Sequence, residues 1–581
     1  MKLQYGNTWW GSEWLKALEE ADHANRLPRG RVYARGGAVI SMHREGETLT
    51  AKVQGTRRTP YHVTLTLPPF PENKVQAFLD DVSRHPSIVT KLLHRELSPA
   101  VMELAEKAGL SLFPSSMNDI EMHCSCPDWA HLCKHIAAVI YEVSRAIDND
   151  PFQVFSLHGV SLVSELKKRH VTITNEMSAK IPRWDDLVKG ELVKDMALPM
   201  AEETAEIPDF TKIKSLFSLW MRVLPASPAF YGRGSFGRVY EKTMTGVRKT
   251  AEKALFDSSA VYVVGGGKDS LELASVSSVH LVIEGLSEGK LYTDRGDWWP
   301  MSRFLAALLD MTEEEAADSS YTVRAFREVV LLAIHLLRTG NAIPELVRVD
   351  ENALSIRWMP TEQDAGTAEA MGILSKWVTP SMVEIARYRE KRCFAREPAE
   401  AALSLFLTHL MQNMAKKNFA DDPIYDLFFM GEPLMAREGR PHPEADGIAS
   451  WLSYFHLSAA RWQPVLLVSD DPKTKAFRLD LSVVDSEDSE GDAVPLADVF
   501  TKDDYDACRY QILKDMDLLS SLVTGMEDYM DSEGRTPISF TAETFAPFLL
   551  EAIPAMRLLG ARACWRDRKS TRLNSSHMSI S

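Results

Sequence analysis

Apolar and polar residues alternate with two different periods along the first 150 residues, one typical of helices and one typical of strands. The segment TWWGSEWLKALEE is rich in aromatic residues and predicts a helix. The segments RVYARGGAVISMHR, LTAKVQG and YHVTLTLPPF alternate with period two and predict strands. Residues 73–110 look helical again, and apolar residues from Ile136 to Ile147 recur at helical spacing. This part of the chain is therefore expected to combine a small sheet with helices.

The remainder of the chain has a different character. Residues 173–208 are weakly patterned and rich in Lys, Glu, Met and Pro, which indicates a linker. Residues 209–480 mix long apolar helices such as REVVLLAIHLLRTG with strand pairs such as LSIRWMP and AFRLDLSVV, without regular βαβ alternation. The predicted fold class is therefore α+β. The predicted division is a domain over 1–170, a linker over 171–208 and a mixed α/β region over 209–566.

Length and composition fit a protein of several domains. At 581 residues the chain is too long for one core, and its 45% hydrophobic and 25% charged residues are ordinary for a globular protein. No apolar run is long enough to span a bilayer, and the N-terminus lacks the apolar block of a signal peptide. We therefore expect a cytoplasmic protein without a membrane partner, with association with the nucleoid as an open alternative.

Cysteine usage points to a metal. Three of the six cysteines fall within residues 124–133, and in a reducing compartment such a cluster is better explained by metal binding than by disulfides. Zinc takes four tetrahedral nitrogen or sulfur ligands, and a set of three Cys and one His is one of its closed structural sites. The predicted ligands of one structural Zn²⁺ are Cys124, Cys126, Cys133 and His135. His123 and His131 are alternative ligands, but only His135 leads directly into the helix that follows.

This Cys-x-Cys and Cys-x-His arrangement, with CPDW between the pairs and CKH at its end, resembles the SWIM zinc finger. With TWWG, NRLPRGRVYARGG and KVQGTRRTPY before it, the motif resembles the N-terminal module of bacterial SWIM-finger proteins over residues 1–165. In that family the module often precedes a Swi/Snf-type DNA translocase, with a helicase-associated region between them. Residues 209–566 are similar in size and character to that region. The resemblance implies a zinc-binding chain that works on DNA.

Charge is unevenly distributed along the chain. The net charge is −15, yet residues 1–70 carry ten Lys or Arg and six Asp or Glu. Basic side chains between glycines, on the predicted strands and turns, would contact phosphates in a salt-dependent and sequence-indifferent way. A solvated sheet face with arginines paired to glutamates is the alternative. The predicted nucleic-acid-binding residues are Arg26, Arg29, Arg31, Arg35, Lys52, Arg57 and Arg58.

Two segments imitate enzyme motifs. GRGSFGRVY at residues 232–240 matches the Gly-rich loop of protein kinases, but no V-A-I-K, H-R-D or D-F-G sequence follows, so a loop leading into a helix is expected. GGGKDS at residues 265–270 lacks the Ser or Thr of a Walker A loop. It looks like the phosphate loop of adenylylating pyrophosphatases, but the β-branched residues after it favour a hairpin. No catalytic residue is predicted.

The expected function is that of a zinc-binding region that contacts DNA and protein and guides a Swi/Snf-type ATPase. The motor would either follow in the same natural chain, after the sequence given, or belong to a separate partner protein. The main alternative is a non-enzymatic SWIM adaptor that acts in trans, and a third is a nucleotide enzyme built around Gly265–Ser270. Residues 567–581 break the local pattern and can be back-translated into a sequencing adapter. We therefore expect these residues to be an artefact, and the natural reading frame to continue into an ATPase motor.

Overall fold

The computed structural model divides into two compact units. Unit 1 combines residues 1–177, 225–236 and 443–581, and unit 2 combines residues 178–224 and 237–442. The structure describes residues 5–19, 26–128, 132–169, 181–191, 206–228, 230–262, 268–361, 363–387, 391–416, 422–435, 444–457, 460–471, 476–487 and 492–565. Among these residues, no helix is both long and apolar enough to cross a membrane.

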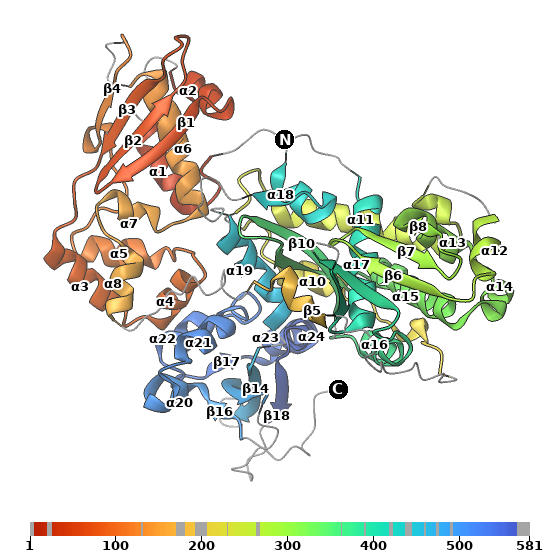
Figure 1. The fold of residues 1–581 in the computed structure, drawn as a ribbon. Coiled ribbons are helices and arrows are strands. Elements are labelled where there is room, and N and C mark those ends of the chain that lie inside the picture. Colours follow the sequence, from red (N-terminus) through yellow and green to blue (C-terminus); the bar gives the residue numbers. More distant parts are fainter. Residues whose placement is uncertain are drawn as a thin grey trace. The chain divides into compact units, whose positions relative to one another are not determined.

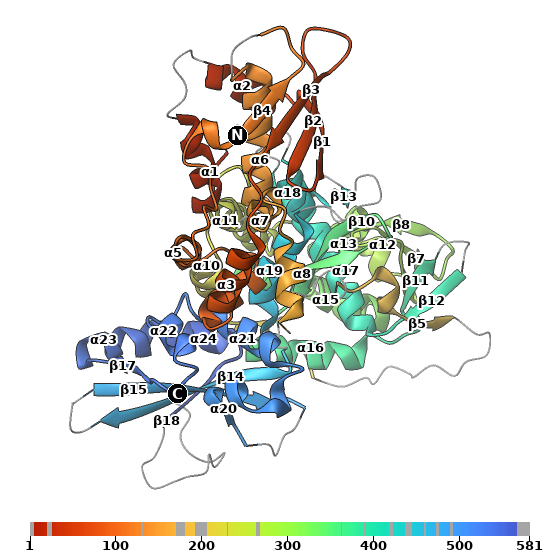
Figure 2. The same cartoon turned by 90° about the vertical axis from the view of Figure 1, so that its left-hand side faces the viewer.

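The N-terminal part of unit 1 is a four-stranded antiparallel sheet covered by helices. Its strands, in the order β1-β2-β3-β4, are β1 (Val39–Glu45), β2 (Thr48–Val53), β3 (Tyr61–Thr66) and β4 (Glu121–Cys124). Its helices are α1 (Trp9–Glu19), α2 (Arg26–Arg35), α3 (Glu72–Val82), α4 (Pro86–Leu93), α5 (Ala100–Lys107), α6 (Lys134–Asn149), α7 (Gln153–Leu157) and α8 (Leu162–Lys168). Helix α6 contacts all four strands, and α1 and α2 pack on α6 (Figures 1 and 2).

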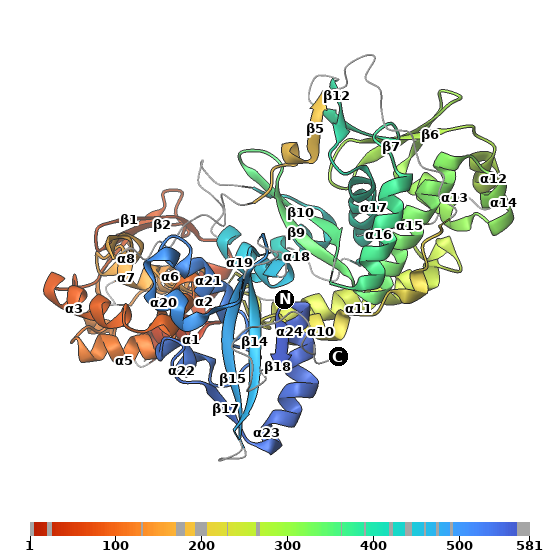
Figure 3. The same cartoon turned by 90° about the horizontal axis from the view of Figure 1, so that it is seen from below.

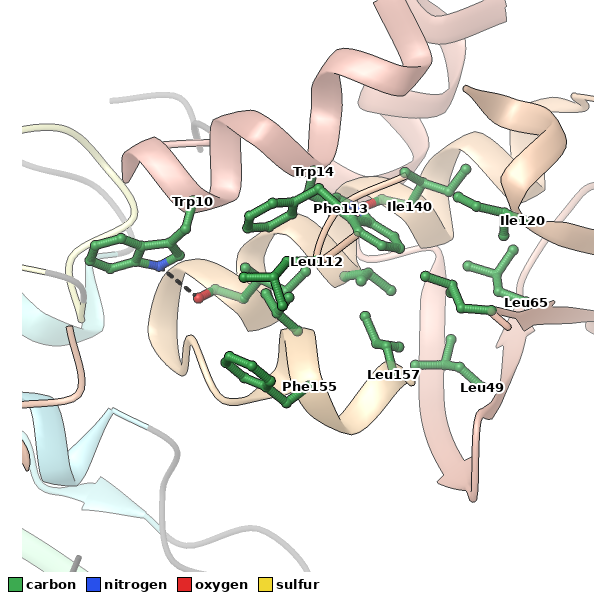
Figure 4. Packing of buried hydrophobic residues seen from close by; sticks show 14 of the residues in the cluster. Trp10, Trp14, Leu49, Leu65, Leu112, Phe113, Ile120, Ile140, Phe155 and Leu157 are labelled. Atoms are coloured by element: carbon green, nitrogen blue, oxygen red, sulfur yellow. Dashed lines mark hydrogen bonds between the residues drawn. The ribbon is translucent and has the colours of Figure 1, made fainter. Parts of the chain in front are cut away.

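Alternation along the strands explains how this sheet holds α6. Leu49, Ala51 and Val53 on β2 are buried, while the residues between them are exposed or half-buried, so one face meets the helices. Helix α1 docks through its tryptophans, whose indole N–H groups donate to backbone carbonyls of α6: Trp10 to Ile147 at 3.0 Å and Trp14 to Ile140 at 3.1 Å (Figure 4). The aromatic-rich helix predicted around residues 8–20 and the amphipathic helix predicted around residues 136–147 are confirmed.

The basic stretch before the sheet differs from its prediction. Arg26–Arg35 form helix α2, and only Val39–Glu45 of the predicted strand RVYARGGAVISMHR is extended. A methyl group at Gly30 would lie 2.4 Å from the Cβ of Ala137, so glycine lets α2 pack closely on α6. The strand prediction was wrong because this helix is held by tertiary packing, which local alternation does not reveal.

The C-terminal part of unit 1 is a second sheet with short helices. Strands β14 (Trp462–Asp471) and β15 (Ala476–Asp485) form a long antiparallel pair, and β18 (Arg562–Trp565) runs parallel to β14 (Figure 3). Strands β16 (Val494–Pro495) and β17 (Ile538–Phe540) both pair with β15. The helices are α19 (Ala445–His456), α20 (Leu496–Thr501), α21 (Arg509–Asp517), α22 (Met526–Asp531), α23 (Ala542–Pro547) and α24 (Ile553–Leu558).

A buried imidazole joins the two parts of unit 1. Helix α4 contacts α21 and α22, and His94 follows directly after α4. Its Nε2 donates a hydrogen bond of 2.9 Å to the carbonyl of Lys514 and lies 3.8 Å from a carboxylate oxygen of Asp517. Burial lowers the pKa of His94 to about 3 and raises the pKa of Asp517 to about 6. The charged groups around this pair are Lys91, Glu96, Lys514 and Glu527.

These shifts predict opposite pH slopes for two single variants. The folded pKa of His94 lies below its unfolded value, so its contribution to stability is lost as pH falls below about 6.5. The folded pKa of Asp517 lies above its unfolded value, so its contribution is lost as pH rises towards 6. The two effects oppose each other between pH 4.5 and 6. As pH rises from 4.5 to 6, the free energy of unfolding of Asp517→Asn is expected to increase by about 2 kcal/mol relative to wild type. Over the same rise, that of His94→Gln is expected to decrease by about as much relative to wild type.

Denaturant unfolding of the three chains at several pH values measures these slopes. The comparison with wild type cancels the acid release of any bound metal, which all three chains share. Slopes of the same sign in both variants would contradict the assignment of the two buried groups.

Unit 2 contains two sheets and the longest helices of the described chain. A three-stranded sheet has the order β13-β10-β9, and a six-stranded mixed sheet has the order β5-β12-β11-β6-β7-β8. The strands are β5 (Val188–Glu191), β6 (Val279–Ile283), β7 (Gly289–Thr293), β8 (Trp298–Pro300), β9 (Ala342–Arg348), β10 (Ala353–Pro360), β11 (Val383–Arg387), β12 (Lys391–Ala395) and β13 (Leu434–Met435). The helices are α10 (Phe217–Val223), α11 (Phe236–Ala254), α12 (Lys268–Ala274), α13 (Met301–Asp310), α14 (Glu313–Asp318), α15 (Tyr321–Thr339), α16 (Ala365–Trp377), α17 (Pro398–Met414) and α18 (Pro423–Tyr425).

Helix α17 is the centre of unit 2. It packs on β10 of the smaller sheet and on β6, β11 and β12 of the larger one, and α15 and α16 pack against it (Figure 3). Its apolar residues are buried around most of its circumference. Helices and sheets mix here without βαβ alternation, which confirms the predicted α+β class.

Two segments of unit 2 differ from their sequence predictions. The hairpin predicted around GGGKDS is wrong in its described part, because Lys268–Ala274 form helix α12 and the next strand starts at Val279. The glycines 265–267 lie outside the described residues. Helix α12 has seven residues, so the long helix that a pyrophosphatase-like phosphate loop needs is not present there. The linker predicted over 171–208 includes strand β5, and its other parts lie mostly outside the described residues. The predicted domain boundaries stay predictions.

Candidate metal centre

The four predicted zinc ligands come from two elements that the fold brings together. Cys124 ends strand β4, where it lies opposite Val63 of β3, and Cys126 follows two residues later. Cys133 caps the N-terminus of α6, its sulfur accepting from the N–H of Ile136, and His135 lies in the first turn of that helix. Cys133 and His135 are buried, and Cys124 and Cys126 are half-buried. Strand pairing and helix packing therefore fix both halves of the cluster.

Distances within the cluster fit a small tetrahedral ion. The four ligand atoms lie within 4.8 Å of one another. Nδ1 of His135 is 3.9 Å from the sulfur of Cys124 and 3.9 Å from that of Cys133. Zinc bonds of about 2.3 Å to sulfur and about 2.0 Å to nitrogen imply nitrogen–sulfur separations of about 3.6 Å in a tetrahedron. The side chains are thus positioned for one structural zinc ion, and the two nitrogen–sulfur distances are within a few tenths of an ångström of the values expected around it.

The electrostatics of the cluster also favour a cation. A hydrogen bond from the Cys124 thiol, helped by His135 and the N–H of Ile136, lowers the pKa of Cys133 to about 4. The same pairing, with burial, raises the pKa of Cys124 far above its ordinary value. One thiolate is therefore held in a buried place beside two further thiols, where a divalent cation would release their protons and neutralise the charge.

Two tyrosines and a glycine hold the ligand imidazole. The Tyr61 ring lies 4.5 Å from the His135 ring, and the Tyr33 ring meets it edge-on at 5.6 Å. Lys134 donates a 2.6 Å hydrogen bond to the Tyr33 hydroxyl. A methyl group at Gly55 would lie 2.5 Å from the Tyr61 ring and 3.2 Å from Nε2 of His135, so a side chain there would displace both rings. Sequence reasoning missed these residues, although RVYARGG and KVQGTRRTPY contain three of them.

The alternative histidine ligands have different outcomes. His123 is exposed on β4 opposite Thr64 and is not part of the cluster. His131 lies outside the described residues. With four protein ligands the site has no open position for a catalytic water, so the ion would hold β4 and α6 together.

The predicted nucleic-acid-binding residues fall into three places. Arg57 and Arg58 are exposed in the turn between β2 and β3, and Lys52 is exposed on β2. The others lie on α2, where Arg29 is exposed and Arg31 and Arg35 are half-buried at one pocket. Arg26 begins α2, but its side chain lies outside the description. The structure therefore brings together Arg57 with Arg58, and Arg31 with Arg35. A role for any of them in binding nucleic acid stays a prediction.

Comparison with known proteins agrees with this geometry. Residues 118–144, which contain all four cluster residues, match the family model of the SWIM zinc finger. The chain carries a SWIM zinc finger. Residues 299–437, within unit 2, match a domain of unknown function, DUF8276.

One relative among the known proteins is the uncharacterized protein Rv2102 of Mycobacterium tuberculosis (strain ATCC 25618 / H37Rv). It is 36% identical over 152 residues, which are 26% of this chain and 55% of the relative. The chain thus spans about half the length of this relative. No solved structure matches the chain.

Proposed function

We propose that the SWIM finger holds a surface that binds the phosphate backbone of nucleic acid, and that the chain thereby guides a Swi/Snf-type motor on DNA. The observation that carries this proposal is the position of Arg57 and Arg58. They are exposed in a turn packed directly against the zinc cluster, where the metal would fix their location.

Contacts within the turn link its arginines to the metal. The guanidinium of Arg57 lies 5.8 Å from the centre of the Tyr61 ring, which in turn packs on His135. The side-chain amide of Gln54 donates to the backbone carbonyls of Gly55 and Arg57 at 3.0 and 2.5 Å. The turn is thus preorganised from both sides, which lowers the entropic cost of ordering it on a ligand.

The exposed face of the sheet extends the same surface. Residues directly opposite each other in an antiparallel pair share a face, so Ser41, Lys52 and His62 form one row across β1, β2 and β3. This row lies at the end of the sheet nearest the Arg57–Arg58 turn. Glu45 and Glu121 lie at the other end of that face. Positive charge therefore gathers towards the zinc end, where phosphates would bind.

The motor partner is supported by the order of motifs before the SWIM finger and by the character of the region after it. If the chain guides such a motor, adding it should change the rate of DNA-stimulated ATP hydrolysis by a Swi/Snf-type ATPase from the same cell. If the rate is unchanged while the chain still binds DNA, the proposal that the chain guides a motor is wrong. The proposal that it binds DNA would not be affected.

Salt dependence of binding tests the surface. The chain is expected to bind a duplex oligonucleotide without sequence preference, with an affinity that falls steeply as salt rises. Replacing Arg57 and Arg58 together with Gln should lower affinity about tenfold at low salt and reduce the slope of log K against log salt by about 2, one unit for each lost phosphate contact. Fluorescence anisotropy at several salt concentrations measures both quantities.

A matched control removes the same charge elsewhere. Arg84, two residues after the end of α3, and Lys107, the last residue of α5, both pair with Asp81 of α3, which is not part of the sheet. The double change to Gln at these positions should leave the slope unaltered. Affinity that ignores both salt and the Arg57–Arg58 change would exclude DNA as the ligand and favour an adaptor that binds protein.

A further inference from the structure

A polar pocket lies in unit 1, and neither the zinc site nor the proposed DNA surface accounts for it. Its volume is about 600 Å³, within the usual range for small-molecule sites. Three segments far apart in the sequence line it: residues 5–8 before α1, helix α2 through Arg31 and Arg35, and the loop at 227–235. That loop contains most of the Gly-rich segment GRGSFGR, which resembled a kinase phosphate loop.

The loop is held in place by contacts within unit 1. The Ser235 hydroxyl donates a 2.7 Å hydrogen bond to the carbonyl of Ala226 and so closes the loop across nine residues. Phe230 and Phe236 pack on Trp451 with ring centres 6.3 and 5.2 Å away, and the Trp451 indole N–H donates to the carbonyl of Pro225. Gly234 has a φ of 112°, a conformation that a residue with a side chain rarely adopts. The loop that forms this wall of the pocket therefore has a defined conformation.

The positively charged side chains that line the pocket favour an anionic ligand. Arg31 and Arg35 are four residues apart on α2, so they lie on one face of the helix and both border the cavity. Nε of Arg31 is buried and has no hydrogen-bond partner in the described part of the chain. Among the described lining residues there is no Asp or Glu. Two guanidinium groups at one cavity match the charge of a phosphate group, and each offers the paired N–H donors that phosphate oxygens accept.

The nearby carboxylates already have donors. Asp148 accepts from the backbone N–H groups of Gly6, Asn7 and Thr8, which lie at the edge of the pocket. Glu142 accepts from the Tyr5 hydroxyl and pairs with Arg145. Both acids are thus engaged by residues 5–8 or by Arg145 of α6. They also stiffen the wall formed by residues 5–8.

We propose that this pocket binds a phosphomonoester, with Arg31 and Arg35 holding the phosphate and the Gly-rich loop covering it. A cavity of this volume accepts a group the size of a mononucleotide but not a continuous duplex, so the phosphate is either free or at the end of a strand. The site lies on α2 and the 227–235 loop, so it goes beyond the surface around Arg57 and Arg58 and does not depend on it.

Calorimetric titration of the full chain with adenosine monophosphate, and with adenosine as the control, tests the phosphate requirement. Adenosine monophosphate should bind with a dissociation constant below the millimolar range, and adenosine at least tenfold more weakly. Arg31→Gln and Arg35→Gln should each weaken binding tenfold or more. Arg29→Gln, an equal loss of charge from an exposed position on the same helix, should change it less than twofold.

A second set of measurements separates the source of the phosphate and guards against misfolding. A duplex with 5′ phosphates that competes with adenosine monophosphate more strongly than its unphosphorylated counterpart identifies a strand end, and equal weak competition identifies a free ligand. Ser227→Trp should block the pocket without a change of charge, while thermal unfolding of the variants stays close to wild type. No binding of either phosphate probe by the wild type, equal binding of adenosine, or equal losses in Arg29→Gln and Arg31→Gln would overturn the proposal.

Discussion

Cys126→Ser and His135→Ala are each expected to abolish zinc binding and to remove the cooperative unfolding transition of unit 1. Either change leaves a charged, partly buried cluster without its ion, and it frees the end of β4 from the start of α6. Structural zinc contributes about 10–16 kcal/mol in zinc-finger peptides, which is as large as the whole stability of an ordinary domain, about 5–15 kcal/mol. Elemental analysis should give one zinc per wild-type chain and almost none in the variants, and calorimetry should show the lost transition.

The neighbouring histidine supplies the control for this experiment. His123 is exposed on β4 and opposite Thr64, on the face of the strand that turns away from the cluster. His123→Ala should therefore retain one zinc and unfold like the wild type. A wild-type chain that contains no metal and still unfolds cooperatively would contradict the structural role of the ion.

The metal cluster could be predicted from the sequence because its information is local. All four side chains fall within twelve residues, and thiolates and imidazole at this spacing have few other uses. Strands β2 and β3 and helix α6 were predictable for a similar reason, since each shows its own period of buried residues. Helices α15 and α17 were predictable because their apolar runs are too long for strands.

What escaped prediction depends on contacts between distant residues. Helix α2 is stabilised by the close approach of Gly30 to Ala137, more than a hundred residues later. The ring of Tyr33 on α2 and the ring of Tyr61 on β3 lie against His135 because both elements pack on α6. The Gly-rich loop could be rejected as a kinase motif from sequence, but its position beside Arg31 and Arg35 is set by packing on Trp451. The local pattern of apolar and polar residues does not indicate which distant residues will be in contact.

Asp148→Ala is expected to lower the free energy of unfolding by about 3–5 kcal/mol, because four half-buried donors lose their acceptor, each at the low end of the cost of about 1–3 kcal/mol for an unsatisfied donor. The Asp148 side chain, on α6, is part of a residue only 1% exposed. Its two oxygens accept from the N–H groups of Gly6, Asn7 and Thr8 at 3.0, 3.1 and 3.0 Å, and from the Thr8 hydroxyl at 2.6 Å. It thus joins the start of α1 to the far end of α6. Nothing in the sequence around Asp148 marks this role.

The form of the loss distinguishes hydrogen bonding from charge. Burial raises the pKa of Asp148 above its ordinary value even though its hydrogen bonds oppose the shift, so the carboxylate gains nothing from ionisation itself. Asp148→Asn keeps one acceptor oxygen but turns an amide N–H₂ towards two donors, so its loss should be about half that of Asp148→Ala. Glu106→Ala, an exposed carboxylate removed from α5, should change stability by less than about 0.5 kcal/mol. Urea unfolding of the four chains at pH 7 measures the order, and a loss in Asp148→Ala no larger than in Glu106→Ala would contradict the role of Asp148.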